Sequence, residues 1–161
     1  MKDFLNKMSS TVIVTIGLFA TILGIYQYFE SKPSGDVTGA WTLNLVIVNT
    51  RYKSFENLII GYQLYLNQSG DLVVGYGEKT YEGNKQLPLS QRVKINVRGH
   101  YNDHKLDLLF TLFGHERNTI GEFRLEFVSD DVFQGNFSTT GANSNGPVSL
   151  KRADALRLSI R

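Results

Sequence analysis

The stretch RVKINVR, residues 92–98, decides the fold more clearly than any other part of this chain. Val93, Ile95 and Val97 alternate with charged and polar residues. In an extended segment, successive side chains point to opposite faces, so the three apolar side chains would share one face. The stretch therefore predicts a β-strand with one buried face and one exposed face.

The same alternation, often next to turn-type residues, recurs along the rest of the chain. The expected strands begin at Val37 and then cover 58–67, 72–79, 92–98, 105–113, 122–127, 132–138 and 147–151. No helical segment is expected between them. Eight sequential antiparallel strands with one apolar face each predict an all-β, lipocalin- or avidin-like up-and-down barrel, which leaves no open sheet edge. A two-sheet sandwich is the alternative. The barrel is favoured by glycines within the strands, because strongly bent strands need them: Gly61, Gly75, Gly77, Gly121 and Gly135.

The N-terminal part has a different pattern. Residues 8–29 contain no charge over 22 positions, and SSTVIVTIGLFATILGIYQYF fills 9–29. A helix of that length spans about 30 Å, the thickness of the bilayer's hydrocarbon core. The sequence predicts one N-terminal transmembrane helix within 1–30, a linker at 31–36, the barrel at 37–152 and a tail at 153–161. A cleaved signal peptide is the alternative interpretation. Small residues spaced for close helix association are Gly17, Ala20, Thr21 and Gly24.

Composition limits the possible chemistry. The net charge is only +2, which argues against a partner such as a DNA or RNA polymer. The absence of cysteine excludes disulfides, thiol catalysis and cysteine-ligated zinc. No nucleophile motif, phosphate-binding loop or metal-ligand spacing occurs, and His100 and His104 flank an expected turn. We therefore expect a protein that is not an enzyme and needs no cofactor or metal.

A barrel of eight strands is wide enough to hold one small ligand at its mouth. Aromatic residues could stack on a base, and charged or amide residues could pair with its edge and with phosphate. The sequence candidates for such a ligand site are Tyr62, Tyr76, Glu78, Lys79, Arg117 and Asn136. The alternative is that these residues only pack or pair at the barrel rim.

The segment DVTGAW, residues 36–41, resembles the glycine-x-tryptophan opening of lipocalin-like and avidin-like barrels. The resemblance implies that Trp41 packs across the closed end, beneath Lys151 or Arg152. The whole layout, an apolar segment, a short linker and a barrel, resembles the transmembrane β-barrel effectors of bacterial cyclic-oligonucleotide-based anti-phage immunity. Those effectors typically have two membrane helices, whereas this chain shows one apolar segment.

This second resemblance implies a barrel that senses a cyclic dinucleotide, forms a homo-oligomer and disrupts the inner membrane. The expected partners are the ligand, the lipid bilayer and further copies of the chain. The resemblance implies a single-pass protein of the bacterial inner membrane with the barrel in the cytoplasm. The basic residues Lys2 and Lys7 instead favour a cytoplasmic N-terminus, which would place the barrel on the other side. The alternatives are a membrane-tethered carrier of an apolar ligand and a purely structural association module.

Overall fold

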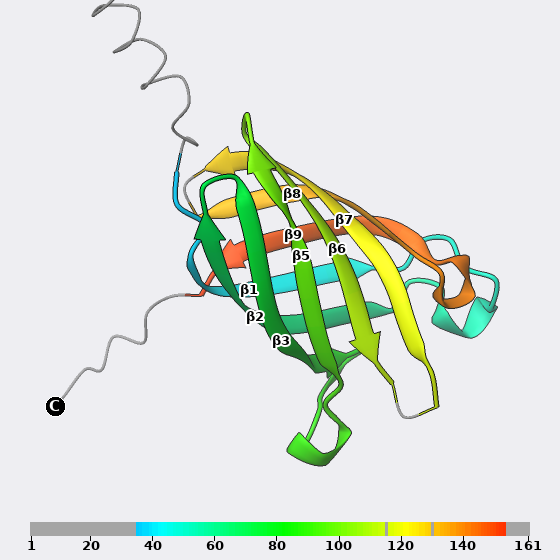
Figure 1. Cartoon of the computed structure of the whole chain (residues 1–161). Coiled ribbons are helices and arrows are strands. Elements are labelled where there is room, and N and C mark those ends of the chain that lie inside the picture. Colours follow the sequence, from blue (N-terminus) through cyan, green and yellow to red (C-terminus); the bar gives the residue numbers. More distant parts are fainter. Residues whose placement is uncertain (1–34, 115, 130, 154–161) are drawn as a thin grey trace, which may run out of the picture. The chain divides into compact units, whose positions relative to one another are not determined.

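Eight long strands form one closed antiparallel sheet in the computed structural model, which describes residues 35–114, 116–129 and 131–153 (Figure 1). The strands are β1 Gly39–Val46, β2 Ile59–Ser69, β3 Leu72–Glu82, β5 Lys94–Asn102, β6 Lys105–Phe113, β7 Asn118–Ser129, β8 Val132–Thr139 and β9 Asn145–Arg152. A two-residue strand, β4 Lys85–Gln86, pairs with the end of β3. Each expected strand is present, and most extend beyond their expected bounds.

The sheet closes because β1 pairs with both β2 and β9, and β2 pairs in turn with β3. The long strands therefore follow one another around a ring in chain order, which confirms the up-and-down barrel and excludes the sandwich. Strands four places apart in this ring of eight lie on opposite walls. β3 is thus opposite β8, and β1 is opposite β6.

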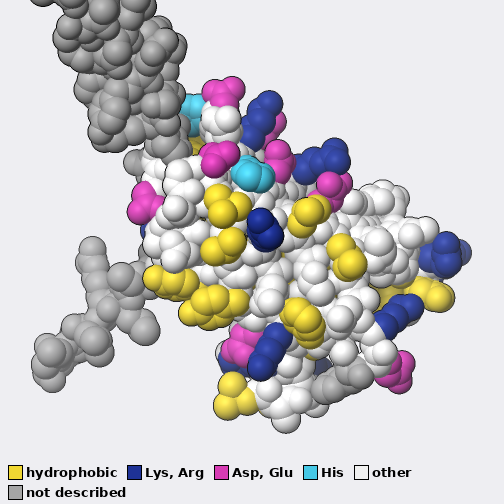
Figure 2. All heavy atoms as spheres, viewed as in Figure 1, with side chains coloured by type: hydrophobic (Ala, Val, Ile, Leu, Met, Phe, Trp, Pro, Cys, Tyr) yellow, Lys and Arg dark blue, Asp and Glu magenta, His cyan; other side chains and the backbone are white. Residues whose placement is uncertain are grey.

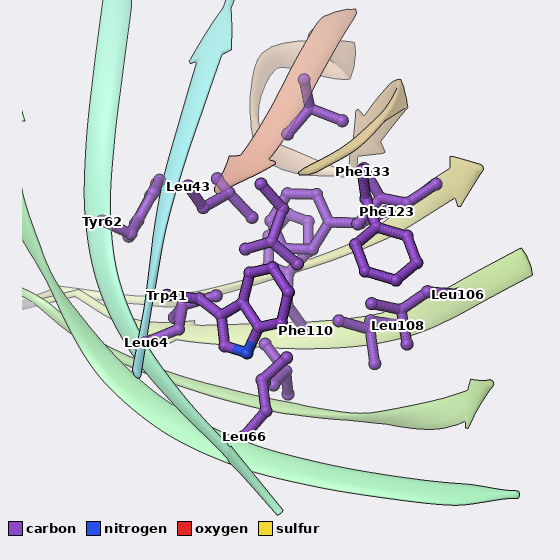
Figure 3. Close-up of a cluster of buried hydrophobic side chains, with 14 of the residues drawn as sticks. Trp41, Leu43, Tyr62, Leu64, Leu66, Leu106, Leu108, Phe110, Phe123 and Phe133 are labelled. Carbon is purple, nitrogen blue, oxygen red and sulfur yellow. The ribbon is translucent and has the colours of Figure 1, made fainter. Parts of the chain in front are cut away.

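Alternate residues of the long strands fill the inside of the barrel (Figure 3). Ile95 and Val97 of the opening stretch are buried, while Lys94, Asn96 and Arg98 are exposed. The other long strands follow the same rule except at bulges in β3 and β7, and together they supply a single apolar core. Period-two patterning in the sequence thus becomes an inside and an outside once the sheet closes.

The strand glycines allow the sheet to coil tightly. A Cβ atom at Gly77 would lie 2.0 Å from the carbonyl oxygen of Gln63 on β2. A Cβ atom at Gly135 would lie 1.9 Å from the carbonyl oxygen of Arg124 on β7. Neighbouring strands approach so closely here that no side chain fits, which supports the sequence argument from glycine for a barrel.

The two ends of the barrel differ. At one end, which we call the hairpin end, tight connections join β2 to β3, β5 to β6 and β7 to β8. At the other, the loop end, longer connections carry three short 3-10 helices: η1 Lys53–Phe55, η2 Leu89–Gln91 and η3 Gly141–Asn143. The expectation of no helical segment was therefore wrong. A single 3-10 turn needs only one hydrogen bond and no amphipathic pattern, so hydrophobic periodicity does not reveal it.

The expected membrane helix, its small residues Gly17, Ala20, Thr21 and Gly24, the linker up to residue 34 and the tail from residue 154 lie outside the described residues. Among the residues that the structure does describe, no helix is long and apolar enough to span a bilayer. The chain divides after Pro33, and the barrel unit is described by itself.

Candidate ligand site at the loop end

The hairpin end is closed by Trp41, which is fully buried. Its indole Nε1 donates a hydrogen bond to the Val37 carbonyl oxygen at 2.8 Å. The ring packs edge-on against Phe133, with 5.7 Å between ring centroids. The guanidinium carbon of Arg152 lies 4.4 Å from the centroid of the indole ring, which is a cation–π contact. The structural role expected for Trp41 is confirmed, with Arg152 rather than the exposed Lys151 above it.

Arg152 also fastens the start of the barrel to its last strand. Its Nη1 and Nη2 donate to the carbonyl oxygens of Thr38 and Asp36 at 3.0 and 2.8 Å, and its Nε donates to Asp131 at 3.2 Å. One side chain therefore joins the chain before β1, the turn before β8 and the end of β9. These contacts hold the hairpin end closed except for a small pocket of about 110 Å³ beside Val37, Phe133 and Arg152. The loop end is therefore the wider approach to the interior.

A polar cluster points inward near the loop end. Lys79 lies directly opposite the buried Tyr62 in the β2–β3 register, so the two side chains share the inner face. Glu82 lies opposite Ile60, which packs against the core. Lys79 and Glu82 form an ion pair, and the lysine side chain is only 19% exposed. Placing an ion pair on the inner face of an otherwise apolar barrel carries a desolvation cost, which the 36% exposure of the Glu82 side chain reduces, and the pair is the polar centre of the candidate site.

Tyr62 is electrostatically coupled to this cluster. Burial raises the pKa of the Tyr62 phenol, and the negative charge of Glu82 raises it further. The phenol therefore stays protonated over the whole physiological range, and its hydroxyl can both donate and accept a hydrogen bond. The cluster thus offers a cation, a carboxylate and a neutral hydroxyl side by side.

The loops around this cluster carry exposed rings and cations. Tyr52 and Phe55 of the β1–β2 loop pack edge to face, with 6.3 Å between centroids, and are 51% and 42% exposed. Exposed Lys85 and Arg117 lie in the β3–β5 and β6–β7 connections, at the same end. Exposed rings and flexible cations are the groups that hold flat, anionic ligands.

The structure brings together only some of the residues suggested by the sequence. Tyr62 and Lys79 are neighbours on the inner face, and Arg117 is at the same end of the barrel. Tyr76 is 65% exposed on the outer face, against Tyr65 at 5.9 Å between ring centroids.

The two remaining candidates also lie away from the inner face. Glu78 faces outward and is paired with Arg92. Asn136 is exposed on β8, the wall opposite β3. The six candidates therefore do not form one site.

Glu82 is the important residue that the sequence argument missed. Regular alternation puts residues three apart on opposite faces of a strand, so Lys79 and Glu82 would not meet. However, the register passes from Tyr62 opposite Lys79 to Gly61 opposite Tyr81, which leaves Thr80 as an extra residue in a bulge. The bulge returns Glu82 to the inner face. In the sequence, the nearby Gly61 is the one signal that marks the position of the bulge.

No family model matches the chain, and no curated protein matches it in sequence. Solved structures that resemble it include redesigned β-barrels. The structure of EF1p2_mFAP2b bound to DFHBI aligns with a TM-score of 0.59 at 12% identity, covering 77% of this chain and 99% of that one. A redesigned barrel, mFAP1, bound to DFHBI aligns with a TM-score of 0.55 at 13% identity, covering 72% and 94%. At such low identity, these likenesses show the fold alone: a closed antiparallel barrel of eight strands.

Proposed function

We propose that this chain is a ligand-sensing effector whose barrel binds a small anionic ligand, a cyclic dinucleotide, at the loop end. The observation that carries the proposal is the inward-facing ion pair of Lys79 and Glu82 beside Tyr62. A phosphate can replace the Glu82 carboxylate as the partner of Lys79, so binding needs no new buried cation. Arg117 supplies a second cation at the same end for a second phosphate. Redesigned barrels of this fold have been solved bound to DFHBI, which supports the fold as a ligand container.

The effector step rests on the apolar N-terminal segment of the sequence. We propose that this segment anchors the barrel in the bacterial inner membrane and that ligand-loaded chains assemble into a homo-oligomer that disrupts the bilayer. A single helix cannot open a bilayer alone, so association must be the regulated step. A ligand promotes association only if it binds the assembled state more tightly than the free state.

Calorimetry of the full-length chain in detergent tests the ligand site. Cyclic dinucleotides should bind the wild type at micromolar concentration and should fail to bind Lys79→Ala combined with Arg117→Ala. The matched control, Lys105→Ala with Lys151→Ala, removes the same charge at the hairpin end and should bind normally. Absence of binding to the wild type would reject the sensor proposal.

A growth assay tests the effector step separately. Gly24→Leu places a large side chain on the small-residue face of the apolar segment and should abolish toxicity when an active cyclase is co-expressed. Ligand binding by this variant should be unchanged. Toxicity that persists in Gly24→Leu would disconnect the apolar segment from killing.

The second candidate function is a carrier of an apolar ligand. It is favoured by the interior, where the buried side chains of the described residues are almost all hydrophobic. The same calorimetry with fatty acids separates the two, because a carrier should bind fatty acids and should not need Lys79 and Arg117 together.

A further inference from the structure

The outer wall formed by β3, β5, β6 and β7 carries large apolar side chains in water. Leu109 on β6 is 64% exposed and Val74 on β3 is 42% exposed. Figure 2 shows hydrophobic side chains gathered around a basic one on this face of the barrel. The core does not need these side chains, because they are on the outside of a sheet whose inner face is already filled. An exposed apolar patch of this kind indicates a contact surface.

Arg98 lies between these two apolar residues in the strand register. Within the described part of the chain, its guanidinium has no hydrogen bond or ion pair. It lines a shallow hollow of about 370 Å³ together with Leu109 and Glu122. The wall therefore combines a free cation, an exposed leucine and a carboxylate around one depression.

We propose that this wall binds the same wall of a second copy of the chain, giving a pair that forms without ligand and that the ligand of the proposed function then assembles further. The cross-strand register gives one outward-facing row in the order Val74, Arg98, Leu109, Glu122 and Ser138. A twofold axis along β6 through Leu109 places Leu109 against its own copy. The same axis places Arg98 against Glu122 of the second copy, and Glu122 against the second copy's Arg98. The three central residues of the row are thus self-complementary, as a twofold contact requires, and Val74 faces Ser138 of the second copy.

Other orientations fit less well. A twofold axis along the row, across the strands, would place Arg98 against Arg98 and Glu122 against Glu122, which repel. The axis along β6 also keeps both hairpin ends on the same side. Residue 35 begins the described chain near Tyr101 at that end, so both described chains would begin on the same side of the pair.

Glu122 is already held in position for this contact. Its carboxylate accepts from Arg124 at 2.9 Å and from the Ser138 hydroxyl at 3.2 Å, and its side chain is 33% exposed. A carboxylate has room for further donors, so it can accept Arg98 of the second copy without releasing its own partners. The contact therefore needs no rearrangement within the barrel.

Two charged residues on the axis oppose the contact: Asp107 and, four residues before Leu109, Lys105. Asp107 lies on the outer face of β6, two residues before Leu109, so the same axis brings it towards its own copy. Two carboxylates there repel, while Arg124 and His100, its cross-strand neighbours, reduce the repulsion. Neutralising Asp107 should therefore strengthen the association between the two copies.

Disulfide trapping tests the proposal in the full-length chain without ligand. Because the chain has no cysteine, Leu109→Cys introduces a single thiol on the axis. Mild oxidation should link two such chains in high yield. The matched control is Asn44→Cys, an exposed position on β1 on the opposite wall, and it should link several-fold less.

Charge reversal in the Leu109→Cys background completes the test. Arg98→Glu or Glu122→Arg alone should lower the yield several-fold, and the two together should restore it. Asp107→Asn should raise it. Equal yields from the two cysteine positions, no recovery in the double reversal, or no gain with Asp107→Asn would overturn the proposal. Because no ligand is present, these outcomes are independent of the cyclic-dinucleotide proposal.

Discussion

Replacing Trp41 with alanine should remove the closure of the hairpin end and a large part of the barrel's stability. The indole is fully buried and packs on Phe133, so the substitution empties a large aromatic site. Such truncations cost about 3–5 kcal/mol, which includes the cavity that remains. The lost hydrogen bond to the Val37 carbonyl oxygen falls within that range. Domains of this size are stable by roughly 5–15 kcal/mol, so the barrel should weaken severely without losing its fold.

Urea unfolding of the 34–161 unit measures this loss. With a denaturant slope of about 2 kcal/mol per molar, the midpoint should fall by roughly 2 M. Trp41 is the only tryptophan, so the transition must be followed by far-ultraviolet circular dichroism rather than by tryptophan fluorescence. Trp41→Phe is the matched control, because it keeps a ring against Phe133 and should lower the urea midpoint clearly less than Trp41→Ala.

A double-mutant cycle with Arg152→Ala isolates the cation–π contact. Arg152 is 33% exposed, so we expect a coupling of about 1 kcal/mol between the two substitutions, at the lower end of cation–π energies. If Trp41→Ala leaves the midpoint unchanged, the indole does not close the barrel. If the two substitutions are strictly additive, Arg152 acts only through its hydrogen bonds.

Three further predictions follow from the barrel's construction. Deleting residues 1–32 should leave a soluble β-domain with cooperative unfolding, because the described core is supplied by later residues; an insoluble or unfolded product would contradict the two-part division. The unfolding free energy should fall above pH 10, by up to about 1.4 kcal/mol per pH unit, because the unfolded chain releases the Tyr62 proton that the folded chain retains; Tyr62→Phe should remove this slope in urea titrations at pH 9 to 11. Gly77→Ala should lower the thermal midpoint strongly, because its Cβ would lie 2.0 Å from the Gln63 carbonyl oxygen. Gly70→Ala has open space around the Cβ and a φ of +63°, and should cost only about 1 kcal/mol; equal losses would show that close strand approach does not limit position 77.

The sequence by itself determined the barrel, because its information is local and periodic. Alternation in RVKINVR and the other segments fixes which side chains face inward, and closing the sheet is how eight such strands in succession avoid open edges. The glycines that permit tight coiling are also visible in the sequence. Trp41 was assigned correctly because its motif lies within one short segment.

Only the tertiary structure decided which residues meet. The bulge at Thr80 turns Glu82 inward beside Lys79, whereas a strand pattern with strict period two would place Glu82 on the outer face. Asn136 and Tyr76 are separated onto opposite walls by the order of strands around the ring, which residue spacing along the chain does not specify. Arg152 reaches Trp41 across 111 residues of sequence because β9 returns to pair with β1. Sites of this kind depend on register and closure, which are non-local, and these appear only when the sheet is complete.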